Sequence, residues 1–202
     1  MKNLWVFLYV VVFVFSVTEM AQSTPQTWKE IKDAGELIDT AQITKGAKEL
    51  NYISGELTGY NDIDMYQIHI DDPDAFSVSV WADLSADNDA TLFLFDLEGY
   101  FALSDDDDGP GFLPQFNPGE MSGWDTGLYF LAIDLYMTEP TSDPLSGWTS
   151  TPTPQQEGPY ILSLMGASPA VPSPVSEPAT MLLLGSGLVG FAVFGRKRAS
   201  RE

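Results

Sequence analysis

The sequence has 202 residues, no cysteine and a formal net charge of −20. Without cysteine the chain has no disulfide, no thiolate metal site and no cysteine nucleophile. From Glu49 to Gly195 it contains 23 acidic residues and no lysine or arginine, so nucleic-acid binding through a basic groove is not expected. Apolar segments at both ends leave roughly 150 residues between them, the size of one domain.

Residues 1–23 are typical of a secretory signal peptide. Lys2 supplies a charged start, and the run from Leu4 to Val17 is apolar except for Ser16. Ala21-Gln22-Ser23 then offers small residues at the positions that a signal peptidase requires. The alternative is a retained membrane anchor. Residues 24–49 form an N-terminal arm of mixed composition, in which Gly35 and the polar flanks disfavour a stable helix.

Residues 50–166 are predicted to form an acidic, all-β domain. Apolar and polar residues alternate over 66–70 and 76–80, as in half-buried strands, whereas 90–97 and 128–136 are apolar on both faces, as in central strands. Residues 160–165 form a closing strand. With about seven or eight strands and no long amphipathic helix, we expect a jelly-roll-like antiparallel sandwich. Long loops at 105–123 and 137–158 interrupt it and are candidates for function.

The C-terminal region consists of a Pro/Ser-rich linker at 167–176 and a tail at 177–202. The tail contains an apolar helix at 179–195 and a basic end at 196–202, in which Arg196, Lys197 and Arg198 stop the membrane segment. The apolar run within this helix, from Met181 to Phe194, has 14 residues and spans about 21 Å, less than the roughly 30 Å of a hydrocarbon core. The basic end is expected to stay in the cytoplasm, which places the acidic domain outside.

This order of linker, short motif, glycine-containing apolar helix and terminal basic cluster resembles the PEP-CTERM sorting signal. The motif here is Ser176-Glu177-Pro178 and lacks the first proline of the family pattern. The resemblance implies recognition by a membrane-embedded exosortase and cleavage near the motif, with only transient residence in the inner membrane. It also implies release or attachment at the cell surface, within an exopolysaccharide or biofilm matrix. The alternative is a C-terminal anchor that is never cut.

A second resemblance covers roughly residues 33–165. The segments 54–57 (SGEL), 61–66 (NDIDMY), 89–99 (DATLFLFDLEG) and 127–133 (GLYFLAI) are similar to bacterial pre-peptidase C-terminal domains. The arm segments 33–36 (DAGE) and 39–42 (DTAQ) match the region that precedes such domains. The resemblance implies a non-catalytic jelly-roll-like appendage, often stabilised by calcium and sometimes binding a polymer.

Clustered aspartates in the loops are the candidate metal ligands, because calcium prefers six to eight hard oxygen ligands. An EF-hand is excluded, since Ser104 and Gln115 stand where its first and twelfth ligands belong. We predict instead one calcium site from Asp62, Asp64, Asp105, Asp106, Asp107 and Asp108. Asp33, Glu36 and Asp39 are further candidate ligands through the arm resemblance. The alternative is that these carboxylates are simply solvated.

The sequence offers no catalytic residues that we can name. His69 is the single histidine and lies in an alternating strand, so it is expected on the polar face, and no nucleophile-elbow motif accompanies a serine. Trp81, Trp124 and Trp148 could stack on sugars or cover edges of the sandwich. We therefore expect an exported, non-enzymatic matrix protein that passes the periplasmic side of the inner membrane. The alternatives are a calcium-dependent carbohydrate- or protein-binding adhesin and, less favoured, a secreted hydrolase.

Overall fold

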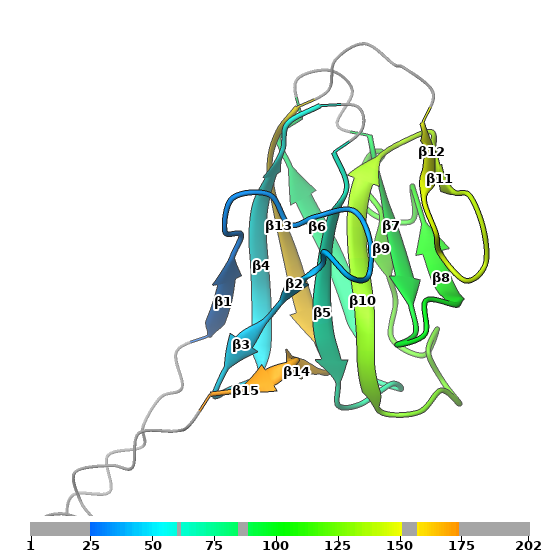
Figure 1. The fold of residues 1–202 in the computed structure, drawn as a ribbon. Helices are drawn as coiled ribbons and strands as arrows, with labels where there is room; N and C mark the ends of the chain where they lie inside the picture. Colours follow the sequence, from blue (N-terminus) through cyan, green and yellow to red (C-terminus); the bar gives the residue numbers. More distant parts are fainter. Residues whose placement is uncertain (1–24, 60–61, 85–88, 151–156, 174–202) are drawn as a thin grey trace, which may run out of the picture.

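The structure is a computed structural model that describes residues 25–59, 62–84, 89–150 and 157–173 (Figure 1). These residues form strands, turns and loops, and no helix occurs among them. The all-β prediction is therefore confirmed for the described part of the chain. The predicted signal peptide, the sorting tail and most of the linker's second half lie outside these ranges.

Two sheets face each other. The five-stranded sheet has the order β1-β4-β13-β6-β9, with bounds Gln26–Lys29, Leu50–Leu57, Gly158–Met165, Ser77–Ala82 and Gln115–Phe116. The six-stranded sheet has the order β14-β5-β10-β7-β8, and β2 also pairs with β5. Its strands are Ala167–Pro169, Asp64–Ile70, Gly127–Leu135, Ala90–Phe95, Phe101–Asp105 and, for β2, Gln42–Ile43. Pairing is antiparallel except where β1 meets β4 and β2 meets β5.

Two short pairs complete the fold. Strands β11 (Thr138–Pro140) and β12 (Trp148–Ser150) form an antiparallel hairpin, and β3 (Lys45–Gly46) pairs in parallel with β15 (Val171–Pro172). The strands predicted at 66–70, 76–80, 90–97, 128–136 and 160–165 correspond to β5, β6, β7, β10 and β13. The described ranges contain fifteen strands, more than the seven or eight expected, and the additional ones are mostly two to four residues long. Such strands are too short to carry a periodic pattern of their own.

The main core lies between the two sheets and follows the alternation of each strand. It is built from inward-facing side chains of both sheets, including Ile53, Leu57, Tyr66, Ile68, Val78, Leu92, Leu131, Ile133, Tyr160 and Leu162. A second cluster occupies the outer face of the six-stranded sheet and contains Met65, Phe93, Phe95, Phe130 and Ala132. This second cluster explains why β7 and β10 are apolar on both faces.

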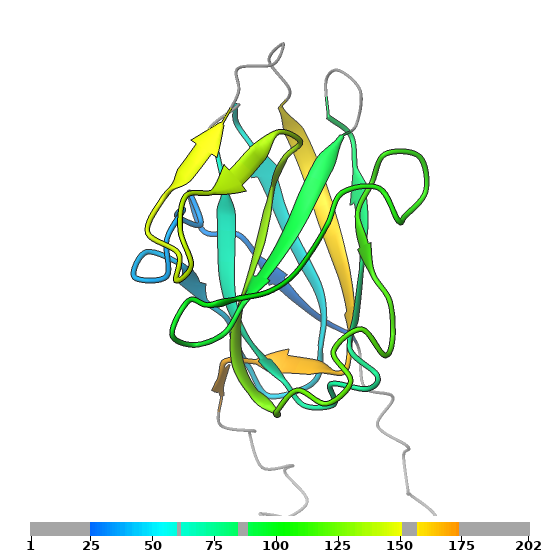
Figure 2. The ribbon, with the colours of Figure 1, turned by 90° about the vertical axis from the view of Figure 1, so that its right-hand side faces the viewer.

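The second cluster is covered by the arm and by the loop that carries β11 and β12. Leu37 and Ile38 of the arm pack on it, as do Leu145 and Trp148. The Trp148 ring meets Phe93 and Phe95 edge-on, with centroid distances of 5.2 Å and 5.9 Å, and its Nε1 donates to the Glu36 carbonyl at 2.7 Å. Figure 2 shows the blue arm and the yellow-green hairpin on the same side of the sandwich.

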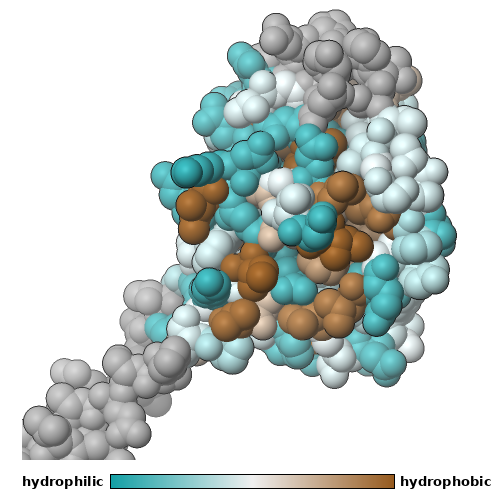
Figure 3. Space-filling view, viewed as in Figure 1, coloured by the Kyte–Doolittle hydropathy of each residue, from teal (hydrophilic) through white to brown (hydrophobic). Residues whose placement is uncertain are grey.

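Paired residues extend the domain beyond 50–166 at both ends. The arm contributes β1, β2 and β3, and residues 167–172 contribute β14 and β15. The first and last described strands lie at the same end of the sandwich, while β4 ends and β5 begins at the opposite end (Figure 1). On the face that Figure 3 displays, apolar groups lie among polar ones.

Candidate functional site

The acidic cluster brings together three carboxylates from two separate segments. Asp33 follows β1 in the arm, Asp62 lies in the turn between β4 and β5, and Asp64 is the first residue of β5. One carboxylate oxygen of each lies within 4.8 Å of the others. Asp62 and Asp64 are thus joined by Asp33, which the arm resemblance had suggested.

Asp64 is fully buried between the sheets. Its Oδ2 accepts a hydrogen bond from the Tyr160 hydroxyl at 2.5 Å, and the Tyr160 and Tyr66 hydroxyl oxygens are 2.6 Å apart. Its Oδ1 is buried and has no hydrogen-bond partner among the described residues. A buried carboxylate oxygen without a partner is costly, so protonation of Asp64 or coordination of a cation would stabilise it.

The surroundings of Asp64 disfavour its charged form. The pKa of Asp64 is raised to about 8, mainly by burial and also by the negative charges of Glu30 and Asp62, although the Tyr160 hydroxyl and the Ala34 N–H oppose the shift. Burial likewise raises the pKa of both Tyr66 and Tyr160 above that of a free tyrosine. A bound cation would have the opposite effect, because its positive charge would stabilise the charged form of Asp64 and lower the pKa of that residue.

The other two carboxylates are fixed by their own turns. Asp33 Oδ1 accepts from the Gly35 N–H at 2.8 Å. Asp62 Oδ2 accepts from the Thr58 N–H at 2.5 Å and from the Thr58 hydroxyl at 2.7 Å. No lysine or arginine forms an ion pair with the three within the described ranges. Three convergent carboxylates of this kind are the hard oxygen ligands that calcium prefers.

The acidic cluster opens into a groove of about 610 Å³. The groove is lined by Lys29, Glu30, Lys32, Asp33, Ser54, Gly55, Glu56, Thr58, Asp62, Trp81, Pro159, Tyr160 and Ile161. Burial raises the pKa of Glu30, and its Oε2 accepts from the Glu56 N–H at 3.0 Å. A Cβ at Gly55 would overlap the Tyr160 hydroxyl and lie 2.6 Å from Glu30 Oε2, so only glycine leaves room for both side chains.

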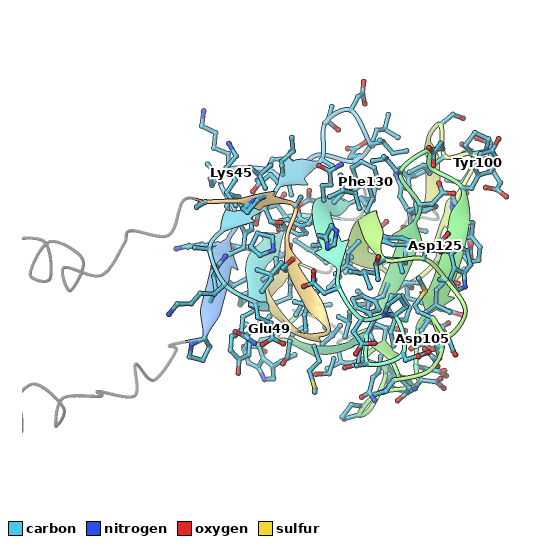
Figure 4. The ribbon with its side chains drawn as sticks, turned by 90° about the horizontal axis from the view of Figure 1, so that it is seen from below. Lys45, Glu49, Tyr100, Asp105, Asp125 and Phe130 are labelled. Atoms are coloured by element: carbon cyan, nitrogen blue, oxygen red, sulfur yellow. The ribbon has the colours of Figure 1, made fainter. Side chains whose placement is uncertain are left out.

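The remaining predicted ligands lie at the end of β8, where Asp105 is the last strand residue, and in the loop that follows it. Asp105, Asp107 and Asp108 form a second group with carboxylate oxygens within 4.8 Å of one another. Asp105 Oδ2 accepts from the Asp108 N–H at 3.1 Å and from the Gln115 N–H at 2.7 Å, so it organises the loop. The Asp105 charge raises the pKa of the exposed Asp108. In Figure 4, Asp105 lies on the opposite side of the molecule from Lys45.

The two groups are separate. Asp64 pairs with Ile133, Ile133 with Leu92, and Leu92 with Asp105, so the two aspartates lie in one row, three strands apart. Three strand spacings are about 14 Å, and calcium–oxygen distances are about 2.3–2.6 Å. A single ion therefore cannot be held by both groups. The single predicted set divides into Asp62 and Asp64 in one place and Asp105 to Asp108 in another.

Asp134 is a buried acidic residue that the sequence analysis did not single out. It lies in β10, its Oδ1 accepts from the Leu135 N–H at 2.6 Å, and its Oδ2 is buried without a partner in the described structure. Burial raises the pKa of Asp134 well above its usual range. The sequence did contain a sign of this buried residue, because Asp134 is the one charged residue within the apolar run 128–136.

His69 lies on β5 and contacts the Asp71 carboxylate, and no serine hydroxyl is bonded to its imidazole within the described residues. Its Nδ1 is 2.8 Å from Asp71 Oδ1, and the Ser168 hydroxyl donates to the same oxygen at 3.0 Å. Ser168 is therefore bonded to the carboxylate and not to the imidazole, unlike the serine of a catalytic triad.

Comparison with known proteins identifies one feature of the chain. The PEP-CTERM protein-sorting motif matches residues 174–198, which include Ser176, Glu177, Pro178 and the basic cluster at 196–198. The resemblance to pre-peptidase C-terminal domains is not confirmed. No curated protein is significantly similar to the chain. Over the described ranges, no helix is long and apolar enough to cross a membrane.

Proposed function

We propose that this chain is an exported, non-enzymatic protein of the cell surface or extracellular matrix, delivered by an exosortase-type system, whose β-domain binds calcium. The observation that carries the proposal is the PEP-CTERM protein-sorting motif at residues 174–198. That motif implies processing by exosortase, a membrane protease. We also propose that the protein associates with exopolysaccharide in the matrix. We propose as well that its domain is a jelly-roll-like sandwich of the pre-peptidase C-terminal type.

The arrangement of the domain supports such delivery. The described chain begins at β1 and ends at β15 at one end of the sandwich, and the turn between β4 and β5 lies at the other end (Figure 1). A tail that leads from residue 173 toward a membrane would therefore leave the acidic cluster facing away from it.

Calcium binding is supported by the fit of the acidic cluster to the ion. Asp33, Asp62 and Asp64 would hold it, and the unpartnered Oδ1 of Asp64 is the group that most needs it. A bound calcium would neutralise the converging carboxylates. The three residues would then fasten the arm to the turn between β4 and β5.

Mass spectrometry of the mature protein from its own cells tests the sorting proposal. We expect a C-terminus close to Glu177 in wild-type cells and an uncut tail in cells without the exosortase. The Glu177→Ala variant should also stay uncut, whereas Ser200→Ala, beyond the matched residues, should be processed normally. A mature C-terminus at Glu202 in wild-type cells would overturn the processing claim.

A calcium-dependent adhesin is the second candidate, favoured by the groove beside the acidic cluster. Replacing Asp64 would then weaken binding to the partner surface as well as calcium binding. A cell-adhesion assay in calcium and in chelator separates this candidate from a purely structural calcium site.

A further inference from the structure

A row of side chains crosses the outer face of the five-stranded sheet along the groove. Trp81 of β6 pairs with Ile161 of β13, Ile161 with Ser54 of β4, and Ser54 with Lys29 of β1. All four line the groove. At about 4.8 Å per strand, the row is about 14 Å long. The groove thus has an aromatic end at Trp81 and a charged end at Lys29.

Trp81 differs from the tryptophans that hold the fold together. Trp148 and Trp28 use their Nε1 groups internally, on the Glu36 carbonyl and on Gln42 Oε1. Trp81 is 54% exposed, and within the described structure its Nε1 makes no hydrogen bond and its ring meets no other aromatic ring. An exposed indole at the rim of a groove offers an apolar face and a polar N–H to a ligand.

The charges in the groove restrict the class of ligand. Four carboxylates line it, from Glu30, Asp33, Glu56 and Asp62, against two ammonium groups, from Lys29 and Lys32. An anionic chain would be repelled by this excess of negative charge. Neutral hydroxyl groups can donate to the carboxylates and accept from the lysines.

We propose that this groove binds a neutral saccharide chain, with one sugar ring stacked on Trp81 and its neighbours extending over Ser54 toward Lys29. The apolar C–H face of a sugar ring matches the indole, and its hydroxyl groups match the polar end of the row. This proposal goes beyond the calcium site and does not require it, because backbone pairing of β1, β4, β13 and β6 alone holds the row in place.

Titration with neutral oligosaccharides tests the proposal. The protein purified from its own cells is titrated calorimetrically with cello-, malto- and laminari-oligosaccharides, and with an oligouronate as the charged comparison, both in calcium and in chelator. We expect at least one neutral series to bind, more tightly than the oligouronate. Trp81→Ala should weaken that binding at least tenfold, and Trp81→Phe should retain part of it.

Trp124→Ala is the matched control, because Trp124 is also exposed, at 40%, and does not line the groove. It should bind like wild type. Thermal unfolding of each variant establishes that it is folded, and its calcium response reports on the acidic cluster independently of the saccharide result. The proposal is overturned if no neutral series binds, if Trp81→Ala binds like wild type, or if the oligouronate binds best. It is also overturned if sedimentation shows a dimer that Trp81→Ala dissociates, since a second copy would then occupy the groove.

Discussion

The two acidic groups of this molecule contain the same type of side chain in opposite environments. Asp64 is buried between two sheets and leaves one oxygen without a partner. Asp105 lies at the partly exposed end of β8 and accepts hydrogen bonds from two backbone N–H groups, those of Asp108 and Gln115. A cation would therefore stabilise the first group, whereas Asp105 of the second group is already stabilised by hydrogen bonds from its own backbone surroundings.

The comparison shows that the density of carboxylates in a sequence is a poor guide to a metal site. The run Asp105 to Asp108 is the densest in the chain, yet exposed acidic groups are well solvated without an ion. The acidic cluster of Asp33, Asp62 and Asp64 is sparse in sequence and convergent in space. Burial and unmet hydrogen bonding distinguish the two, and the following experiments test that distinction.

The largest expected effect is the pH dependence of metal-free stability. The pKa of Asp64 is about 8 in the folded protein and about 3.9 when unfolded, so only the folded state keeps the proton between these values. Stability from this group is thus full below pH 4 and falls as the pH rises to about 8. At about 1.4 kcal/mol per pH unit, the loss from pH 5 to pH 8 is about 4 kcal/mol.

Urea unfolding in chelator at a series of pH values measures this loss. Asp64→Asn should remove the part of the pH-dependent loss of stability that is due to Asp64. The part due to Asp134 should remain, because burial also raises the pKa of Asp134. Asp107→Asn, in the exposed loop, should follow wild type. Equal pH profiles for wild type and Asp64→Asn would show that Asp64 is not protonated in the folded state.

Calcium should stabilise the protein through the acidic cluster alone. At a calcium concentration 100 times the dissociation constant, we expect about 2.7 kcal/mol of stabilisation, which is roughly 5–10 °C in the midpoint of thermal unfolding. Asp64→Asn should abolish the shift, and Asp108→Asn should preserve it. A shift that survives Asp64→Asn and disappears in Asp108→Asn would reverse the assignment of the two groups.

Gly55→Ala should destabilise the protein by about 1–3 kcal/mol, the usual cost of overpacking. The added Cβ would displace the Tyr160 hydroxyl and the Glu30 carboxylate. The hydrogen bond that Tyr160 donates to Asp64 would then be disrupted. Gly127→Ala is a suitable control, because Gly127 also lies in a strand and nothing is within 4 Å of its would-be Cβ. Chemical unfolding of the two variants compares them directly.

The smallest effect is expected from Asp105→Ala. It removes the acceptor of two hydrogen bonds, but water can replace that acceptor in this partly exposed region, so we expect a loss of about 1 kcal/mol and an unchanged calcium response. Asp107→Ala, whose carboxylate makes no hydrogen bond within the described residues, should have almost no effect. A lost calcium response in Asp105→Ala, measured by thermal unfolding, would contradict the separation of the two groups.

The alternation of apolar residues predicted the long strands well. In β5, Tyr66, Ile68 and Ile70 face the main core between the two sheets, as expected. Alternation of apolar and polar residues is a local property of the sequence and predicts which face of a strand is buried. The short strands β2, β3, β14 and β15 were not predicted, since two or three residues contain too little pattern. Their pairing depends on neighbours that are distant in the sequence.

The candidate site was predicted only in part, for the same reason. The turn at Asp62 and Asp64 is local and was found, and Asp33 was suggested only by the arm resemblance. The distance between Asp64 and Asp105 depends on the register of four strands, which composition does not specify. The buried state of Asp64 arises from Tyr160, which lies 96 residues further along the chain.

The pairing of β3 with β15 determines how a load applied at the C-terminal side of the described domain would be transmitted. A pulling force applied at Ser173 reaches first the backbone around Thr44 and Gly46, which accepts hydrogen bonds from Val171 and Ser173. Thr44 also accepts from the Ala170 N–H and donates to the Gln67 carbonyl of β5. Tension would therefore spread into the six-stranded sheet at one end, while the opposite end, with the groove and the acidic cluster, stays unstrained until these bonds give way.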